Sequence, residues 1–277
     1  MKRILSLGAG VQSSTLLLMS CRGEIDKLDA AVFADTQWEP ADVYRHLEWL
    51  EGEAKAAGIP VHRVTAGNLR DHAVNGKPKK TKEGTHFVSL PIFTEAADGS
   101  RGIVTTRQCT RDYKIRPQVR KFREIAGLRK GQRCPKSPVI EQWFGISIDE
   151  PMRVRSSRDA WIEFRYPLVY ELRFTRQRCL EWLAANYPGR HIPRSACIGC
   201  PFHSDQEWQR IKADPVAWAD AVDADRRIRR EARGQRTSLG FLHRSFKPLE
   251  DADLRSADDR AGQSKLWNHE CEGMCGV

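Results

Sequence analysis

The fold is decided by the stretch KRILSLGAGVQSST, residues 2–15. Its first part, Lys2–Leu7, is short and apolar and predicts a strand, and the segment Val11–Cys21 after the Gly/Ser turn predicts a helix. Small residues let backbone N–H groups approach an anion, and the amino terminus of a helix adds a favourable dipole. The turn is therefore a candidate phosphate site, with an ordinary strand-to-helix turn as the alternative.

The segments that follow repeat this alternation. Residues 30–34 predict a buried strand, residues 40–57 a helix with proline in its first turn, and residues 59–64 another strand. Strands that alternate with helices form a parallel sheet with helices on both faces. We therefore expect an α/β fold with a doubly wound, mostly parallel sheet, which binds ligands at the carboxyl ends of its strands.

The rest of the chain contains fewer predicted strands. Strands are expected over residues 86–93 and 139–146, and helices over 112–125, 175–186, 205–213 and 215–232. From Leu239 onward the sequence is polar and predicts an irregular stretch. We expect a nucleotide-binding domain over residues 1–174 and, packed on it, a helical cap with a cysteine-containing tail over residues 175–277.

Charge and hydropathy narrow the class of partner. The 277 residues carry a formal net charge of +10, with a pI near 9.3. This balance favours polyanions as binding partners, either nucleic acid or phosphorylated nucleotides, with solubility alone as the other interpretation.

No apolar run is long enough to span a bilayer, and no signal-peptide core follows the basic N-terminus. We expect a cytoplasmic protein that does not enter a membrane.

The eight cysteines favour metal or redox chemistry over disulfides in such a protein. The sharpest pattern is Cys197-x-x-Cys200, because two thiolates at this spacing can hold one metal ion or cluster. Cys109 lies among basic residues, which favour its thiolate, and is the natural third ligand. A redox dithiol is the alternative for the pair. The candidates for a further ligand are Cys134, Cys271 and Cys275.

The opening turn resembles the PP-loop of the adenine nucleotide alpha-hydrolase superfamily, with a double serine that the phosphoadenosine phosphosulfate reductase branch often carries. Later segments are similar to motifs of this family in the same order, and the set spans roughly residues 4–202. These segments are Phe33–Thr36, Ala57–Val61, Arg107–Pro117, Gly145–Arg153 and Tyr166–Leu168. The resemblance implies a PP-loop fold and ATP or another adenine nucleotide as cofactor, with Mg²⁺ as a further candidate.

The resemblance also implies roles for individual residues. Lys114 and Arg153 lie inside matched motifs and would neutralise phosphates or a leaving pyrophosphate. The residues expected at the nucleotide are Ser6, Gly8, Gly10, Gln12, Ser13, Ser14, Asp35 and Arg107. Iron–sulfur members of the branch have cysteines at positions that match Cys109, Cys197 and Cys200. This implies a 4Fe-4S cluster, and three thiolates would leave one of its irons open.

The tail from Asn268 to Val277 resembles the Glu-Cys-Gly tail of sulfonucleotide reductases, with Glu272 inserted between cysteine and glycine. This resemblance makes Cys271 a candidate nucleophile or sulfur carrier.

One hypothesis for the function is an ATP-dependent sulfurtransferase that adenylates and thiolates a nucleic acid (DNA or tRNA) or a nucleotide. Another is a sulfonucleotide reductase that forms sulfite through Cys271. A third is a nucleic-acid-binding protein with a structural cluster. Candidate partners are a sulfur donor or thiol-reductant protein and a second copy, as a homodimer.

Overall fold

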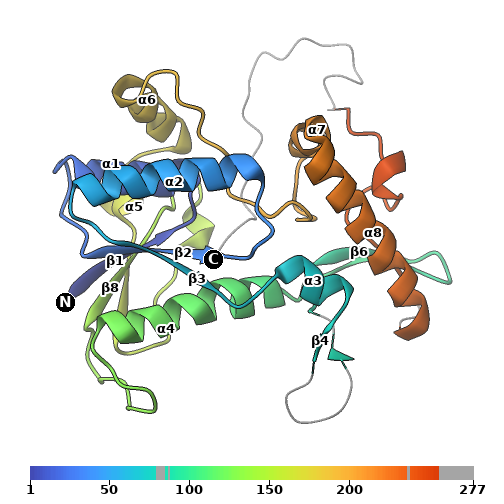
Figure 1. Ribbon diagram of the computed structural model, residues 1–277, viewed down its shortest axis with the longest axis horizontal. Helices are drawn as coiled ribbons and strands as arrows, with labels where there is room; N and C mark the ends of the chain where they lie inside the picture. Colours follow the sequence, from blue (N-terminus) through green and yellow to red (C-terminus); the bar gives the residue numbers. More distant parts are fainter. Residues whose placement is uncertain (79–84, 87, 236–237, 256–277) are drawn as a thin grey trace. The chain divides into compact units, whose positions relative to one another are not determined.

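The computed structural model describes residues 1–78, 85–86, 88–235 and 238–255 (Figure 1). The chain forms two compact units, and each is assembled from three separate segments. Unit 1 comprises residues 1–35, 41–65 and 114–195, and unit 2 comprises residues 36–40, 66–113 and those from 196 onward. Each unit combines early and late parts of the chain, so the units have different boundaries from the expected domains 1–174 and 175–277. Those domains stay a prediction.

Unit 1 is built on a five-stranded parallel sheet in the order β3-β2-β1-β8-β9. The strands are β1 (Lys2–Leu7), β2 (Ala30–Asp35), β3 (Val61–Thr65), β8 (Ile140–Phe144) and β9 (Ile162–Arg165). The chain moves outward from β1 to β3 and then returns to the other side of β1. The switch point where open α/β sheets bind ligands therefore lies between β1 and β8.

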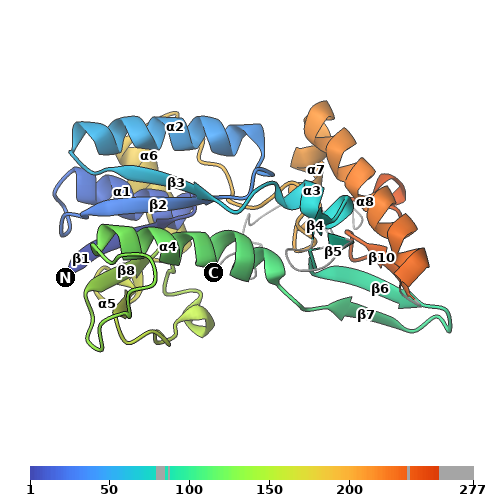
Figure 2. The ribbon, with the colours of Figure 1, turned by 60° about the horizontal axis from the view of Figure 1, so that its bottom comes forward.

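Helices cover both faces of this sheet, as Figure 2 shows: α1, α2 and α6 lie on one face and α4 on the other. The helices of unit 1 are α1 (Val11–Cys21), α2 (Ala41–Ala56), α4 (Arg116–Ile125), α5 (Pro167–Tyr170) and α6 (Arg176–Asn186). A 3-10 turn, η2, spans Pro151–Arg153. The expected α/β fold with a mostly parallel, doubly wound sheet is confirmed.

Both faces of the sheet are apolar because both are buried. Leu5 and Leu7 of β1 belong to the larger core with α1, α2 and α6, whereas Ile4 belongs to the core that contains Phe122 of α4. A strand that is covered on both sides has no solvent face, so it shows a continuous apolar run in place of alternation. This explains why the sequence of β1 predicted a buried strand.

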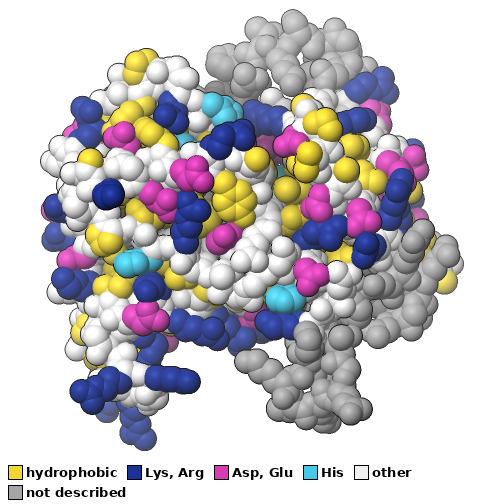
Figure 3. All heavy atoms as spheres, in the orientation of Figure 1, with side chains coloured by type: hydrophobic (Ala, Val, Ile, Leu, Met, Phe, Trp, Pro, Cys, Tyr) yellow, Lys and Arg dark blue, Asp and Glu magenta, His cyan; other side chains and the backbone are white. Residues whose placement is uncertain are grey.

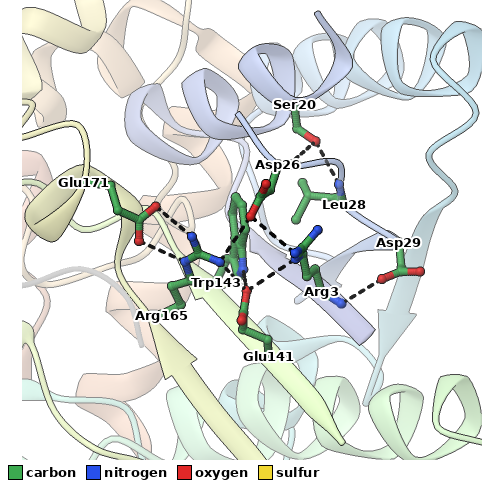
Figure 4. Close-up of polar contacts among 9 residues, drawn as sticks. All are labelled: Arg3, Ser20, Asp26, Leu28, Asp29, Glu141, Trp143, Arg165 and Glu171. Atoms are coloured by element: carbon green, nitrogen blue, oxygen red, sulfur yellow. Dashed lines mark hydrogen bonds and ion pairs between the residues drawn. The ribbon is translucent and has the colours of Figure 1, made fainter. Parts of the chain in front are cut away.

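Ion pairs link β1, β8 and β9 away from the carboxyl end of β1 (Figure 4). Arg165 pairs with Glu141 and Glu171, each at 2.9 Å, and its guanidinium lies 4.9 Å from the centre of the Trp143 ring. The hydrogen bond with Glu171, followed by the one with Glu141, raises the pKa of Arg165. This cation is committed to the fold, so it is a poor candidate for binding a ligand phosphate.

Unit 2 contains a three-stranded antiparallel sheet in the order β10-β6-β7. Its strands are β6 (Ile92–Ala96), β7 (Arg101–Val104) and β10 (Ser238–Phe241), and the short strands β4 (Lys77–Pro78) and β5 (Thr85–His86) pair with each other. The helices are α3 (Leu69–Val74), α7 (Asp205–Ala213) and α8 (Pro215–Gln235), with the 3-10 turn η3 (Leu249–Asp251). A π-helix, η1 (Cys109–Ile115), runs directly into α4.

The sequence predicted helices α7 and α8 of unit 2 but neither α3 nor the sheet. Residues 86–93 do not form one strand, because β5 ends at His86 and β6 begins at Ile92. Leu239, expected to open an irregular stretch, lies in β10 opposite Glu95 of β6. Strands whose partners lie so far apart in the chain leave no local signal in the sequence.

No helix within the described ranges is both long and apolar enough for a membrane span.

Candidate functional site

The turn between β1 and α1, called here the glycine loop (residues 8–10), is closed by its own hydrogen bonds. The Gly8 N–H donates to Ser13 Oγ at 3.2 Å, and Ser13 Oγ donates to the Gly10 carbonyl at 3.3 Å. Ala9 between them is fully buried and adopts a left-handed conformation with φ of 57°. Helix α1 begins at Val11 with no side chain capping it, so its first N–H groups keep their capacity to bind an anion.

Close packing explains Gly10 of this loop and the nearby Gly145. A Cβ atom on Gly10 would lie 3.2 Å from Cβ of Ser195, and one on Gly8 would lie 3.4 Å from Oγ of Ser195. Just after the neighbouring strand β8, a Cβ atom on Gly145 would approach the Ser13 backbone nitrogen to 2.6 Å. The sequence analysis did not place Ser195 at this loop, and no local pattern could have done so, because it follows the loop by more than 180 residues.

The three predicted serines have different surroundings. Ser6 donates to Gln118 of α4 at 2.9 Å and accepts from Gln142 of β8 at 2.7 Å. Ser14 is fully buried and its hydroxyl lies 2.9 Å from Nε2 of His46 in α2. Both hydroxyls therefore hold the sheet and helices together, and Ser13 is the predicted serine whose hydroxyl lies in the glycine loop itself.

His46 is buried beneath the loop. Burial, reinforced by the positive charges of Arg190 and His191, lowers the pKa of His46 to about 4. The imidazole is neutral at physiological pH for this reason. It supports α1 through the Ser14 hydroxyl and adds no charge to the glycine loop.

A polar chain of contacts lies beyond the end of β8. Gln12, in the first turn of α1, donates from Nε2 to Glu150 Oε2 at 3.2 Å and to Ser147 Oγ at 3.4 Å. Arg153 donates to the other oxygen of Glu150 at 2.5 Å. One carboxylate thus connects two residues that the sequence predicted to contact the nucleotide. It places a guanidinium on the segment that follows the switch-point strand, where it can stabilise phosphate charge.

The remaining predicted nucleotide residues are spread over both units. Asp35 is the last residue of β2 and accepts from the Tyr44 hydroxyl at 2.9 Å. Lys114 is half-buried in η1, four residues before Gln118, which contacts Ser6. Arg107 belongs to unit 2, where its guanidinium lies 4.8 Å from the centre of the Phe202 ring. Their contacts with a nucleotide stay a prediction.

The cysteine pair of unit 2 sits in a short turn, called here the cysteine loop (residues 197–200). The Cys200 N–H donates to the Cys197 carbonyl at 3.0 Å, which curls the loop. Cys197 is 8% exposed, and its thiol donates to Oε1 of Glu39 at 3.3 Å. The Thr36 hydroxyl lies 3.2 Å from the same sulfur and donates to the same carboxylate at 3.0 Å. The Asp-Thr motif of the sequence thus supplies a neighbour of the cysteine pair.

Glycine in the cysteine loop allows this contact. Gly199 lies so close to Trp38 that a Cβ atom would overlap the indole ring. The Ile198 N–H donates to the Trp38 carbonyl at 2.8 Å, and the Trp38 indole donates to Asp220 of α8 at 2.6 Å. Residues 36–39 and the cysteine loop are therefore fixed against each other by main-chain and side-chain contacts.

The implied iron–sulfur cluster can be tested against these groups. Cys109 is half-buried and packs on the same hydrophobic core as Cys197. Across the described ranges, no three His, Cys, Asp or Glu side chains converge to hold a metal ion. The cysteine loop does offer two thiols on one turn, and thiolates are the ligands that iron–sulfur clusters take. Cys109, Cys197 and Cys200 as cluster ligands stay a prediction.

Two predicted features fall outside the described residues. Cys271, the candidate nucleophile, and Cys275 belong to the stretch after Arg255. The structure therefore leaves the roles proposed for these residues as predictions.

Comparisons with known proteins give a distant structural similarity. No protein-family model and no curated protein sequence matches the chain. Among solved structures, it is similar to the phosphate complex of phosphoadenylyl-sulfate (PAPS) reductase from Candida auris. The two chains are 13% identical with a TM-score of 0.37, and the match covers 70% of this chain and 75% of the other. That neighbour is of the kind that the sequence motifs resemble, but the likeness is too distant to transfer residues or activity.

Proposed function

We propose that the protein is an adenine-nucleotide-dependent sulfur-transfer enzyme, which binds ATP at the glycine loop and uses a cysteine-held 4Fe-4S cluster to thiolate a nucleic acid or nucleotide. The nucleotide part rests on the chain's own geometry. A tight glycine turn joins the switch-point strand β1 to a helix that no side chain caps. Gln12 lies in the first turn of that helix and is connected to Arg153 through Glu150. Free N–H groups, a helix dipole and a guanidinium are the groups that bind phosphates.

The observation that carries the proposal is the position of Ser195. Ser195 lies against both glycines of the loop, and it stands two residues before Cys197 in the chain. Covalent geometry alone keeps the Cα atoms of residues two apart within about 7 Å. The segment that packs on the glycine loop thus leads directly along the sequence into the cysteine pair, and this favours nucleotide binding and sulfur chemistry in one protein.

The residues would divide the chemistry as follows. Main-chain N–H groups of the glycine loop and Arg153 would bind the phosphates and stabilise pyrophosphate as it leaves. Glu150 would hold Arg153 and Gln12 in place. The cluster, held by Cys109, Cys197 and Cys200, would supply the sulfur chemistry when bound. Cys271 in the tail is a further candidate sulfur carrier.

A basic loop in unit 1 supports a nucleic acid as the acceptor. Residues 127–138, between α4 and β8, contain no acidic residue and four exposed cations, which are Arg129, Lys130, Arg133 and Lys136. Arg123 fixes the loop by donating to the carbonyls of Arg129 at 3.3 Å and Gln132 at 2.6 Å. In Figure 3 the dark blue of lysine and arginine side chains gathers at the lower left, where Figure 1 draws this loop. An ordered group of cations suits the spaced charges of a nucleic-acid backbone.

Binding and turnover by the anaerobically purified protein test the proposal. ATP should bind, and Arg153→Ala should weaken binding about tenfold, equal to ~1.4 kcal/mol. The matched control is Arg178→Ala, which removes an exposed arginine paired with Glu181 and should leave binding unchanged. Pyrophosphate release that requires a nucleic acid supports thiolation. Sulfite release from adenylylsulfate or PAPS in the presence of a thiol would instead identify a reductase, and failure to bind any adenine nucleotide would refute the proposal.

The nucleic-acid part has its own measurement. Replacing Arg129 and Lys130 with alanine should weaken tRNA or DNA binding and reduce the slope of log K against log salt by roughly one to two. The Arg178→Ala variant should keep the wild-type slope. Equal slopes for all three proteins would assign the basic loop to solubility alone.

A further inference from the structure

Exposed apolar side chains of unit 1 gather in two loops. Ile148, Met152 and Tyr170 are 38%, 78% and 64% exposed, and apart from the first methionine they are the large apolar side chains that unit 1 exposes. Two of them lie in the loop after β8 (residues 145–155, the β8 loop), and Tyr170 lies in the loop after β9 (residues 166–174, the β9 loop). Apolar side chains that are grouped at a surface, in contrast to scattered ones, mark a binding site.

The two loops are joined to each other by hydrogen bonds. The Tyr166 hydroxyl donates to the Arg155 carbonyl at 2.8 Å and accepts from the Arg155 N–H at 3.2 Å. The Ile148 N–H donates to the Phe174 carbonyl at 3.0 Å. Beneath the loops, the ring of Tyr166 stacks on Phe144 of β8, with ring centres 5.4 Å apart. The β8 and β9 loops therefore form one ordered surface at the carboxyl edge of the parallel sheet.

The charges of this surface favour a polyanion as the partner. Arg155 and Arg173 are exposed, and neither forms an ion pair within the described part of the chain. The acids of the two loops are engaged by other groups of unit 1: Asp149 accepts from the Arg176 N–H, Glu150 pairs with Arg153, and Glu171 pairs with Arg165. Positive charge therefore remains beside the exposed apolar side chains. A nucleic acid offers the matching groups, because it combines phosphates with the flat faces of bases.

We propose that the β8 and β9 loops bind an unpaired nucleotide of the nucleic-acid acceptor, with the base stacked on Tyr170 and Met152 and the neighbouring phosphates on Arg155 and Arg173. This inference rests on the nucleic-acid acceptor of the proposed function. An aromatic ring can stack with any base, and guanidinium groups neutralise phosphates. The faces of a base inside a duplex are covered by its neighbours, so this surface selects single-stranded or unpaired nucleotides.

The position of the surface suits the part of an acceptor that reacts. The β8 loop also contains Glu150 and Arg153, and Glu150 connects to Gln12 in the first turn of α1. A nucleotide on the β8 and β9 loops therefore lies at the same edge of the sheet as a ligand on the glycine loop. The basic loop of residues 127–138 precedes β8, so it belongs to the opposite edge and would bind a more distant part of the same nucleic acid.

Fluorescence anisotropy with the anaerobically purified, full-length protein tests this inference. The probes are a labelled single strand and the duplex of the same sequence, and a fluorescent base analogue in the single strand reports stacking by its quenching. The variants are Tyr170→Ala, Tyr170→Phe and the double replacement of Arg155 and Arg173 by alanine. The matched control is Val216→Ala, which shortens an apolar side chain of unit 2 that is 80% exposed. Circular dichroism and ATP binding confirm that each variant is folded.

The expected result is that Tyr170→Ala binds the single strand about tenfold more weakly than wild type and no longer quenches the base analogue. Binding of the duplex by this variant, and both measurements for Tyr170→Phe and the control, should stay at the wild-type level. Replacing both arginines should reduce the slope of log K against log salt by roughly one to two for the single strand.

Two results would overturn the inference while leaving the proposed acceptor in place. One is wild-type affinity and quenching in Tyr170→Ala, which would assign the exposed apolar side chains to a protein partner. The other is an equal loss of single-strand and duplex binding in this variant, which would exclude recognition of an unpaired base. If wild type binds neither probe, the nucleic-acid acceptor and the inference fail together, while ATP binding at the glycine loop is judged separately.

Discussion

The glycine loop of unit 1 and the cysteine loop of unit 2 achieve tight packing in the same way and differ in how they treat charge. At each, a glycine lies so close to another segment that a side chain would collide. Gly145, just after β8, lies against Ser13 beside the glycine loop, and Gly199 of the cysteine loop lies against Trp38. Around the glycine loop the charged groups are paired, as Glu150 is with Arg153. Beside the cysteine loop, the carboxylate of Glu39 has no such pair among the described residues.

This difference indicates two kinds of site. Paired polar groups at the end of a parallel sheet can exchange one another for a ligand's phosphates and return to their pairs when it leaves. The carboxylate beside the cysteine loop is instead held by a thiol and a hydroxyl, from Cys197 and Thr36. The glycine loop therefore has charged groups that a ligand can displace, whereas the carboxylate beside the cysteine loop is fixed by neutral groups.

The largest expected effect is on the cysteine loop. In Gly199→Val the new side chain would overlap the Trp38 ring, which cannot swing aside because its indole is bonded to Asp220. Overpacking of this severity should destabilise the protein by about 3 kcal/mol or more. Urea unfolding followed by tryptophan fluorescence measures the loss. Wild-type stability would show that the two segments are not fixed against each other.

The next effect concerns the support beneath the glycine loop. The pKa of His46 is lowered to about 4 in the folded protein, mainly by burial, whereas in the unfolded chain it is about 6.5. Unfolded protein therefore binds the extra proton between these values, so the contribution of His46 is complete above about pH 6.5 and is lost as the pH falls toward 4. It amounts to about 3 kcal/mol at most.

Urea unfolding of wild type and His46→Asn at pH 4.5, 5.5 and 7 measures this contribution. The difference in unfolding free energy between the two proteins should shrink as the pH falls. A difference that is independent of pH would mean that His46 is not protonated on unfolding, and would weaken the picture of a buried support under α1.

A smaller effect is expected at the glycine loop itself. In Gly145→Ala the Cβ atom would come within 2.6 Å of the Ser13 nitrogen, which is backbone and must shift. The shift should disturb the N–H groups offered to phosphate and reduce ATP affinity by roughly thirtyfold, about 2 kcal/mol. Isothermal titration calorimetry measures the affinity, and the unfolding midpoint of the same variant separates local disturbance from loss of the fold. Unchanged affinity would remove this loop from the nucleotide site.

The smallest effect serves as the reference for both loops. Gly52 lies within α2 and has open space around it, so Gly52→Ala should stabilise the protein by about 0.5–1 kcal/mol. ATP affinity and cluster content should stay at the wild-type level. A loss of stability would mean that glycine substitutions are harmful anywhere in this chain, and the two loops would then not be special.

The comparison also separates what the sequence could predict from what it could not. Unit 1 follows from local patterns: β1 is a continuous apolar run, α2 has helical spacing, and Thr175 caps α6 by accepting a 3.0 Å hydrogen bond from the Arg178 N–H. Unit 2 depends on partners far apart in the chain, such as Ser238 and Ala96. Short strands with distant partners carry no periodic signal, so the sheet of unit 2 was missed.

The candidate site shows the same limit. Glycine spacing and the paired cysteines marked both loops in the sequence, because each needs particular residue types at fixed intervals. Ser195 and Glu39 are ordinary residues whose importance arises only from what lies beside them in three dimensions. Ser14 was expected at the nucleotide because its neighbours are, yet its hydroxyl lies in the core against His46. Side-chain direction along a helix start cannot be read from spacing alone.

The left-handed backbone of Ala9 has a consequence for binding. An alanine in this conformation is less stable than glycine by about 1 kcal/mol, and here the surrounding core holds it in place with its methyl group fully enclosed. The curvature of the turn is thus imposed before any nucleotide arrives. A preorganised cradle loses little entropy when phosphate enters, so more of the contact energy is expressed as affinity.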